Sequence, residues 1–279
     1  QHDPLAVADN TPLSDHGRDT LKHELTRIPK KLSLYTLMES VIDAYIRQRE
    51  MAWLEFTQDR NIALALDQAS HIAYEAFLDR YTNLQWPPAK FEDTVTKGCF
   101  PLHPLTTALL CNLKFSAADG LSDPRTVLGF VMEHLSVKMD ESMVVNGAIN
   151  WVRPIALVKY FGESISPETY RLYQNTHRNL NHNADDPQRD TLLALFLLEA
   201  TQLKLSKELQ VKFLAESTGL ITTTVLKALS ALSDNNAIRY DTIKKTYSFW
   251  PADADPGKLE RLLRIKLEKL HFDLTALQA

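Results

Sequence analysis

The sequence predicts a mainly α-helical fold, in which a helical bundle precedes a winged-helix domain that carries a small β-hairpin. Glycine accounts for only 8 of the 279 residues, and so low a glycine content usually accompanies helix-rich chains. Apolar residues recur at helical spacing over most of the chain and alternate as in β-strands only near residues 237–250. The pattern predicts four segments: a linker over 1–30, a helical domain over 31–188, a winged-helix domain over 189–252 and a basic C-terminal helix over 253–279.

Apolar spacing in the helical domain predicts a succession of helices. Pro87 and Pro88 end the second of them, because proline forbids a helical continuation. Pro124 suits a first helical position, and Ser122 or Asp123 can cap the helix that it opens. The expected helices cover 34–46, 61–81, 104–115, 124 to about 162, and 166–180.

The winged-helix prediction rests on the order of elements after residue 190. Two runs near the end of this segment alternate and are rich in aromatic residues, as hairpin strands are. Helix, helix, helix, hairpin is the order of a winged helix, whose third helix contacts bases in DNA-binding members. The expected helices cover 191–202, 206–217 and 221–234, and the expected strands cover 237–240 and 246–250.

Two segments stand out from the helical pattern, and no phosphate-binding loop accompanies them. A P-loop needs Gly-x-x-x-x-Gly-Lys-Ser/Thr, because only glycine lets backbone N–H groups crowd around phosphate. None of the eight glycines has this spacing, and the chain begins with Gln1, so we expect a fragment or processed product. The segments are Lys97-Gly98-Cys99-Phe100-Pro101-Leu102-His103-Pro104-Leu105-Thr106 and Leu121-Ser122-Asp123-Pro124-Arg125-Thr126-Val127-Leu128.

Residues 91–135 resemble the lid region of large AAA+/STAND-like P-loop ATPases, especially the very long ATPases of bacterial phage-defence systems such as BREX. In those proteins a Phe/Tyr-Pro-x-His-Pro-Leu-Thr segment leads into a helix, and an Arg-Thr-Leu/Val-Leu-x-Phe helix follows. Asp123-x-Arg125 with Leu128 is also similar to the sensor-2 helix of origin-recognition-type ATPases, which a winged helix likewise follows. The resemblance covers roughly residues 90–250, and the matching residues are Phe100, Pro101, His103, Pro104, Leu105, Thr106, Arg125, Thr126, Leu128 and Phe130.

The resemblance implies that the domain over 31–188 is lid-like and that Arg125 is a nucleotide-sensing residue. A guanidinium at the start of a lid helix can reach the γ-phosphate and couple nucleotide state to lid position. The alternative is that Arg125 is a solvated residue in the first turn of a capped helix. For His103 we expect hydrogen bonds that fix its loop rather than catalysis. ATP and Mg²⁺ are then expected cofactors of the full-length protein, while the chain alone is expected to bind none.

The winged helix raises the question of nucleic-acid binding. Residues 190–250 hold seven Lys or Arg against six Asp or Glu. A DNA reader depends on phosphate contacts and normally shows a larger basic excess, so packing on the ATPase or on a partner protein is the favoured interpretation. If DNA binds, the expected contacts are Lys227, Arg239, Lys244 and Lys245.

Other kinds of site receive little support from the sequence. Cys99 and Cys111 fit buried thiols in a reducing cytoplasm, and neither a signal peptide nor a membrane span is found. The five-residue spacing of His177 and His182 does not place two imidazoles on one helical face, so no metal site is expected. The basic tail over 257–270 suits a calmodulin target or a membrane surface, but a connector or a packed helix is favoured.

These observations favour a non-catalytic regulatory segment of a large ATPase that couples nucleotide state to a partner or to DNA in phage defence. The expected partners are the missing ATPase core, other protein subunits and DNA, with no membrane. The alternative is a freestanding winged-helix DNA-binding transcriptional regulator, in which the helical domain serves dimerisation or ligand binding. A helical enzyme is a third class, but neither a Gly-x-Ser-x-Gly elbow nor a cysteine-nucleophile pattern is found.

Overall fold

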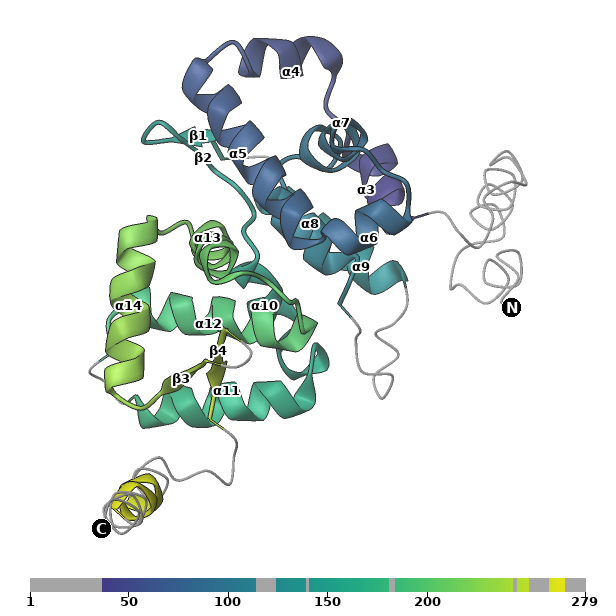
Figure 1. The fold of residues 1–279 in the computed structure, drawn as a ribbon. Helices are drawn as coiled ribbons and strands as arrows, with labels where there is room; N and C mark the ends of the chain where they lie inside the picture. The colour runs from purple at the N-terminus through teal and green to yellow at the C-terminus, as the bar shows by residue number, and fades with distance from the viewer. Residues whose placement is uncertain are drawn as a thin grey trace, which may run out of the picture.

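The computed structural model describes residues 37–113, 124–138, 141–180, 184–242, 245–250 and 261–268. These residues form a mainly helical fold with two small antiparallel sheets of two strands each (Figure 1). The predicted fold class, mainly α with a small β-hairpin, is therefore confirmed. Within this part of the chain no helix combines the length and the apolar character that crossing a bilayer requires.

The N-terminal half consists of α3 (Met38–Ile46), α4 (Glu50–Phe56), α5 (Arg60–Ala76), α6 (Leu78–Asn83), α7 (Pro88–Phe91), the π-helix η1 (Glu92–Lys97) and α8 (Pro104–Leu110). A break at Phe77 divides the helix that the sequence predicts over 61–81. Phe77 leaves helical geometry at φ −117° and ψ 28°, although neither glycine nor proline stands there. As predicted, the chain leaves the helix before Pro87, but Pro88 then opens α7, which the sequence did not predict. α8 begins at Pro104 but is shorter than expected.

The prediction of one helix from 124 to about 162 is wrong for its second half. α9 (Pro124–Lys138) ends early, and a hairpin of β1 (Val144–Val145) and β2 (Ala148–Ile149) follows. Asn146 and Gly147 form its turn with φ of 53° and 76°. Asn-Gly favours such a two-residue turn, because both residues tolerate positive φ. α10 (Ile155–Phe161) then begins separately.

The C-terminal half has the predicted order of three helices and a hairpin, with sharper boundaries than the sequence indicates. Asp185 and Ser206 cap α12 and α13 by accepting the N–H groups of Gln188 (2.9 Å) and Leu209 (3.2 Å). Gly219 ends α13 at φ 81°, where a side chain would be strained. The elements are η3 (Gly162–Ser164), α11 (Pro167–Asn179), α12 (Asp186–Thr201), α13 (Lys207–Thr218), α14 (Thr222–Asp234), β3 (Ile238–Asp241) and β4 (Thr246–Phe249).

The hairpin of β3 and β4 is attached to the helices by two side chains that occupy the outer edge of β4. The buried Gln210 accepts the N–H of Tyr247 (3.3 Å) and donates to the carbonyl oxygen of Lys245 (2.9 Å). Glu199 accepts the N–H of Phe249 at 3.0 Å. Because an open strand edge invites pairing with another chain, these side chains both place the hairpin and close that edge.

Among the described residues, the larger of two apolar clusters runs through both halves of the chain, and a smaller one gathers around Phe100 and Trp151. Members of the larger cluster include Ile42 in α3, Leu105 in α8, Phe196 in α12 and Phe249 in β4, and all four are buried. α12 is apolar on several faces because α10, α11, α13 and α14 all pack against it. The boundary predicted between 188 and 189 falls in the first turn of α12, and separate folding of the two sides stays a prediction.

Gly98 provides a test of this packing, because it lies where a side chain has no room. A Cβ atom on Gly98 would overlap the Asp43 carboxylate and would lie 2.5 Å from the carbonyl oxygen of Thr94. We expect Gly98→Ala to lower the free energy of unfolding by about 1–3 kcal/mol, measured by denaturant titration. The control is Gly129→Ala in α9, whose Cβ would meet only the Tyr160 hydroxyl at 3.4 Å. That control should be neutral or stabilise by up to about 1 kcal/mol; equal effects of the two changes would contradict the expectation.

Candidate functional site

The Phe100–Thr106 loop, which the sequence marks out, is buried at the centre of the molecule. Phe100 is 4% exposed, and Leu102, His103, Leu105 and Thr106 are fully buried. The backbone of Val152 holds the loop in place by three hydrogen bonds. Its carbonyl oxygen accepts the His103 N–H (3.1 Å) and the Thr106 hydroxyl (2.8 Å), and its N–H donates to the carbonyl oxygen of Pro101 (3.0 Å).

His103 uses both ring nitrogens, and its two partners fix its protonation state. Nδ1 accepts the N–H of Leu105 at 3.1 Å and so caps α8. Nδ1 must therefore be unprotonated, and Nε2 carries the hydrogen that it donates to Glu216 Oε2 at 3.0 Å. Burial lowers the pKa of His103 despite the nearby carboxylate. As expected from the sequence, His103 fixes its loop through hydrogen bonds.

Arg153 completes the cluster, which we call the junction: His103, Arg153 and Glu216. Nη1 of Arg153 donates to the backbone oxygen of Glu216 at 2.8 Å and lies 3.7 Å from its carboxylate. Burial opposes ionisation of Glu216, but the His103 hydrogen bond and the Arg153 charge lower the pKa of its carboxyl. Gly219 makes room for the guanidinium, since a Cβ atom there would lie 2.7 Å from Arg153 Nε. The junction thus joins the loop, the segment after β2 and α13.

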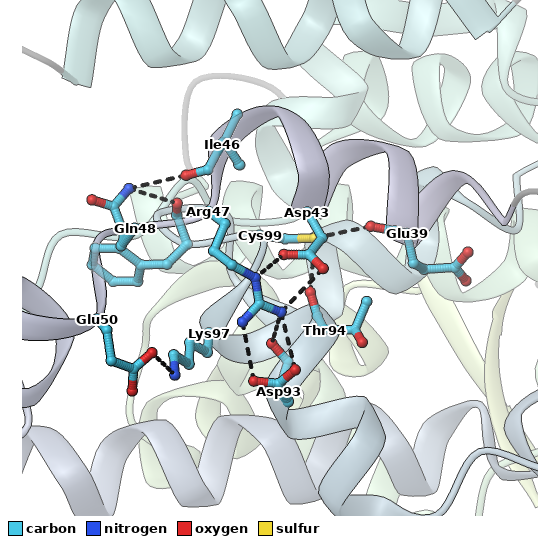
Figure 2. A network of polar contacts seen from close by, with 11 residues as sticks. Glu39, Asp43, Ile46, Arg47, Gln48, Glu50, Asp93, Thr94, Lys97 and Cys99 are labelled. Carbon is cyan, nitrogen blue, oxygen red and sulfur yellow. Dashed lines mark hydrogen bonds and ion pairs between the residues drawn. The ribbon is translucent and has the colours of Figure 1, made fainter. Parts of the chain in front are cut away.

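A second polar network holds the end of α3 and the start of α4 against the π-helix (Figure 2). Arg47 donates from Nε to Asp43 Oδ1 at 2.5 Å and from Nη2 to Asp93 Oδ2 at 3.0 Å. The hydrogen bond from Arg47 lowers the pKa of Asp93. Lys97 Nζ contacts Glu50 Oε2 at 2.6 Å, and Gln48 donates to the backbone oxygen of Phe100 at 3.4 Å. This network positions α4 relative to the same buried loop.

The basic residues proposed as DNA contacts lie on three elements of the C-terminal half. Lys227 is exposed on α14. Arg239 on β3 donates to Ser248 Oγ at 3.3 Å, and its guanidinium lies 5.5 Å from the ring centroid of Trp250. Lys245 lies in the hairpin turn at φ 53°. No hydrogen bond or ion pair joins these three residues to one another.

Two of the proposed site residues cannot be placed. Lys244 lies outside the described residues. Arg125 lies in the first turn of α9, as expected, but its side chain is outside the described part.

The outward face of α14 is mostly uncharged. Ile221 is 71% exposed and Leu226 is 44% exposed, although helices normally bury such side chains. Lys227 is the one basic residue on this face. The exposed residues here are Ile221, Thr222, Thr223, Leu226, Lys227, Ser230 and Asp234.

The cysteines and histidines form no metal centre in the described part of the chain, where no group of three potential ligands is found. Cys99 is buried, and its thiol donates to the carbonyl oxygen of Thr94 at 3.3 Å. Burial raises the pKa of both the Cys99 and Cys111 thiols, which makes each a poor nucleophile. His177 lies in α11, and His182 lies outside the described residues.

Sequence reasoning missed Glu216, Arg153 and Arg47. Glu216 is 113 residues from His103 along the chain, so no local pattern connects them. Comparisons of the chain with protein-family models, with curated proteins and with solved structures return no match. The function is therefore argued from the geometry of this chain.

The neutral state of His103 should make stability depend on pH. The unfolded imidazole has a pKa near 6.5 and the folded one a lower pKa, so the unfolded chain takes up the proton first as pH falls. The stability that neutral His103 supplies is complete above about pH 6.5 and is lost below it, by at most about 1.4 kcal/mol per pH unit. We expect His103→Asn, which keeps a capping acceptor, to flatten the pH dependence between pH 7 and 5 while lowering stability at pH 7.

Denaturant titrations at several pH values measure this difference. The control is Gln68→Asn on the exposed side of α5, a change between uncharged side chains that should leave the slope unchanged. A wild-type slope that survives in His103→Asn would show that the junction histidine does not titrate in this range.

Proposed function

We propose that this chain is a non-catalytic regulatory segment of a large P-loop ATPase that couples nucleotide state to a partner. The observation that carries the proposal is the buried junction, in which His103, Arg153 and Glu216 join the lid-like loop to α13. Together with the resemblance of residues 91–135 to ATPase lids, this contact supports a signalling path from Arg125 in α9 to α14. Phage defence is the setting that the resemblance suggests.

Such a path requires that a displacement of the loop on one side of the junction also displaces α13 on the other side. Buried hydrogen bonds to charged groups are short and directional, and breaking one leaves a costly unpaired group. A displacement of the loop would therefore carry α13 with it instead of stretching the His103–Glu216 contact. α14 packs against α13 and α12, so its outward face would follow.

The kind of partner is suggested by the outward face of α14. Ile221 and Leu226 offer apolar area, while Lys227 offers a single positive charge. Protein interfaces favour apolar centres with few charges, whereas DNA-binding faces depend on several phosphate contacts. We therefore propose a protein partner or the ATPase core itself as the ligand of this face. The alternative, a freestanding DNA-binding regulator, rests on Lys227, Arg239, Lys244 and Lys245.

The sensor role is tested by Arg125→Ala in the full-length protein. If Arg125 contacts the γ-phosphate, loss of its charge should lower ATP turnover on the order of 10²-fold with an unchanged unfolding midpoint. Steady-state ATPase assays with Mg²⁺ measure the effect. The matched control is Arg178→Ala near the exposed end of α11, which should retain turnover.

Two results would contradict the proposal in different ways. Wild-type turnover in a folded Arg125→Ala protein would return Arg125 to a solvated surface role. Micromolar ATP affinity of the isolated chain in calorimetry would show that it carries a phosphate site of its own.

The DNA alternative is tested by a salt titration of duplex binding. With at most four basic contacts, the slope of log K against log salt should be no steeper than about −3.6, and binding at 150 mM salt should be weak. Fluorescence anisotropy with the wild-type chain and with Lys244→Glu/Lys245→Glu measures both quantities. Nanomolar, sequence-selective binding at 150 mM salt would favour the freestanding regulator over the partner-docking proposal.

A further inference from the structure

The helix over residues 261–268 exposes an apolar surface that nothing in the described part of the chain covers. Leu262, Leu263 and Leu267 are 51%, 52% and 64% exposed. An isolated helix this short is unstable in water unless it packs on something. Its charged residues are Arg261, Arg264 and Lys266 against Glu268 alone. The helix therefore calls for a partner surface that is both apolar and acidic.

The surface of α4 and α5 has these properties. Met51 and Leu54 lie one turn apart on the outer side of α4 and are 77% and 51% exposed, and α4 has no buried residue. Leu64 on α5 is 64% exposed. Four carboxylates and one basic residue of this surface are exposed: Glu55, Asp59, Asp67, Glu75 and Arg60. A fifth carboxylate, Glu50, is paired with Lys97. We call this surface the α4–α5 face.

α4 is held in position from its inner side, so the α4–α5 face is preorganised. The rings of Trp53 and Phe56 pack on Phe100 with centroid distances of 5.6 and 5.1 Å. The ion pair of Lys97 with Glu50 fixes the start of the same helix. A surface that is already ordered loses little conformational entropy when a ligand docks.

A second copy of the chain is the occupant that fits best. In Figure 1 the helix over residues 261–268, drawn in yellow, lies at the opposite end of the molecule from α4, with α12 and α13 between them. The positive charge of this helix complements the acidic α4–α5 face of another copy.

We propose that the α4–α5 face binds the C-terminal basic helix of a second copy of this chain. Leucines of the helix pack on Met51 and Leu54, and Arg261 and Arg264 lie near Glu55 and Asp67. Two copies can exchange helices reciprocally, which gives a closed dimer with the same contact twice. Because the contact pairs opposite charges at an exposed surface, added salt weakens it.

Charge reversal in the full chain tests the proposal by sedimentation velocity over a range of protein concentrations. We expect a dimer for the wild type, a dissociation constant raised at least tenfold by Glu55→Lys/Asp67→Lys, and a similar rise for Arg261→Glu/Arg264→Glu. Combining all four changes should restore dimerisation, because the opposite charges are paired again with their signs exchanged. The matched control, Glu163→Lys/Glu168→Lys, makes the same charge change on η3 and α11 and should leave the dimer intact.

Three outcomes would overturn the proposal. A wild-type chain that stays monomeric at 100 µM has no such contact. A dimer that Leu263→Asp abolishes but that Glu55→Lys/Asp67→Lys leaves unchanged uses the helix against another surface. Binding of the monomer to vesicles of anionic lipid, with no dimer in solution, would assign the helix to a membrane surface instead.

Discussion

The backbone of Val152 is the contact on which the arrangement of both halves depends. Its carbonyl oxygen accepts hydrogen bonds from two buried donors, and its N–H donates to the carbonyl oxygen of Pro101. These three hydrogen bonds set the path of the loop. Once the loop is fixed, the side chain of His103 can point only toward Glu216 on α13. Each of these groups is shielded from water, where an unpaired donor or acceptor costs about 1–3 kcal/mol. The three-helix unit and its hairpin are therefore placed by a few satisfied polar groups within an apolar core.

Much of the fold was predictable from local signals. Pro104 and Pro167 open helices where the sequence expects them, and Gly219 closes α13 at positive φ. The three helices and the strands after residue 185 follow from the spacing of their apolar residues, although α12 is apolar on several faces. Where local propensity and tertiary packing agree, the sequence is sufficient to predict the position of a helix or strand.

The errors have separate physical causes. Asn146-Gly147 is a strong hairpin signal, but it sits between helical runs whose periodicity is easier to see. The break at Phe77 has no breaker residue, so only the burial of Phe77 and Tyr81 accounts for two helices there. Glu216 and Arg153 could not be predicted because the junction depends on residues far apart along the chain. The sequence marks the Phe100–Thr106 loop as unusual. Its burial shows that much of this unusual composition contributes to packing in the core.

The π-helix Glu92–Lys97 carries a consequence for how this chain can vary. The N–H of Gly98 bonds to the carbonyl oxygen of Asp93, five residues back, which leaves one residue more in the turn than an α-helix holds. Asp93 and Lys97 face Arg47 and Glu50 only because of that additional residue. Removal of one residue would restore regular α-helical winding and turn one of the two side chains away by about a quarter of a revolution. The number of residues in the π-helix is thus more constrained than their identity. Related chains should therefore tolerate substitutions in this segment more readily than deletions.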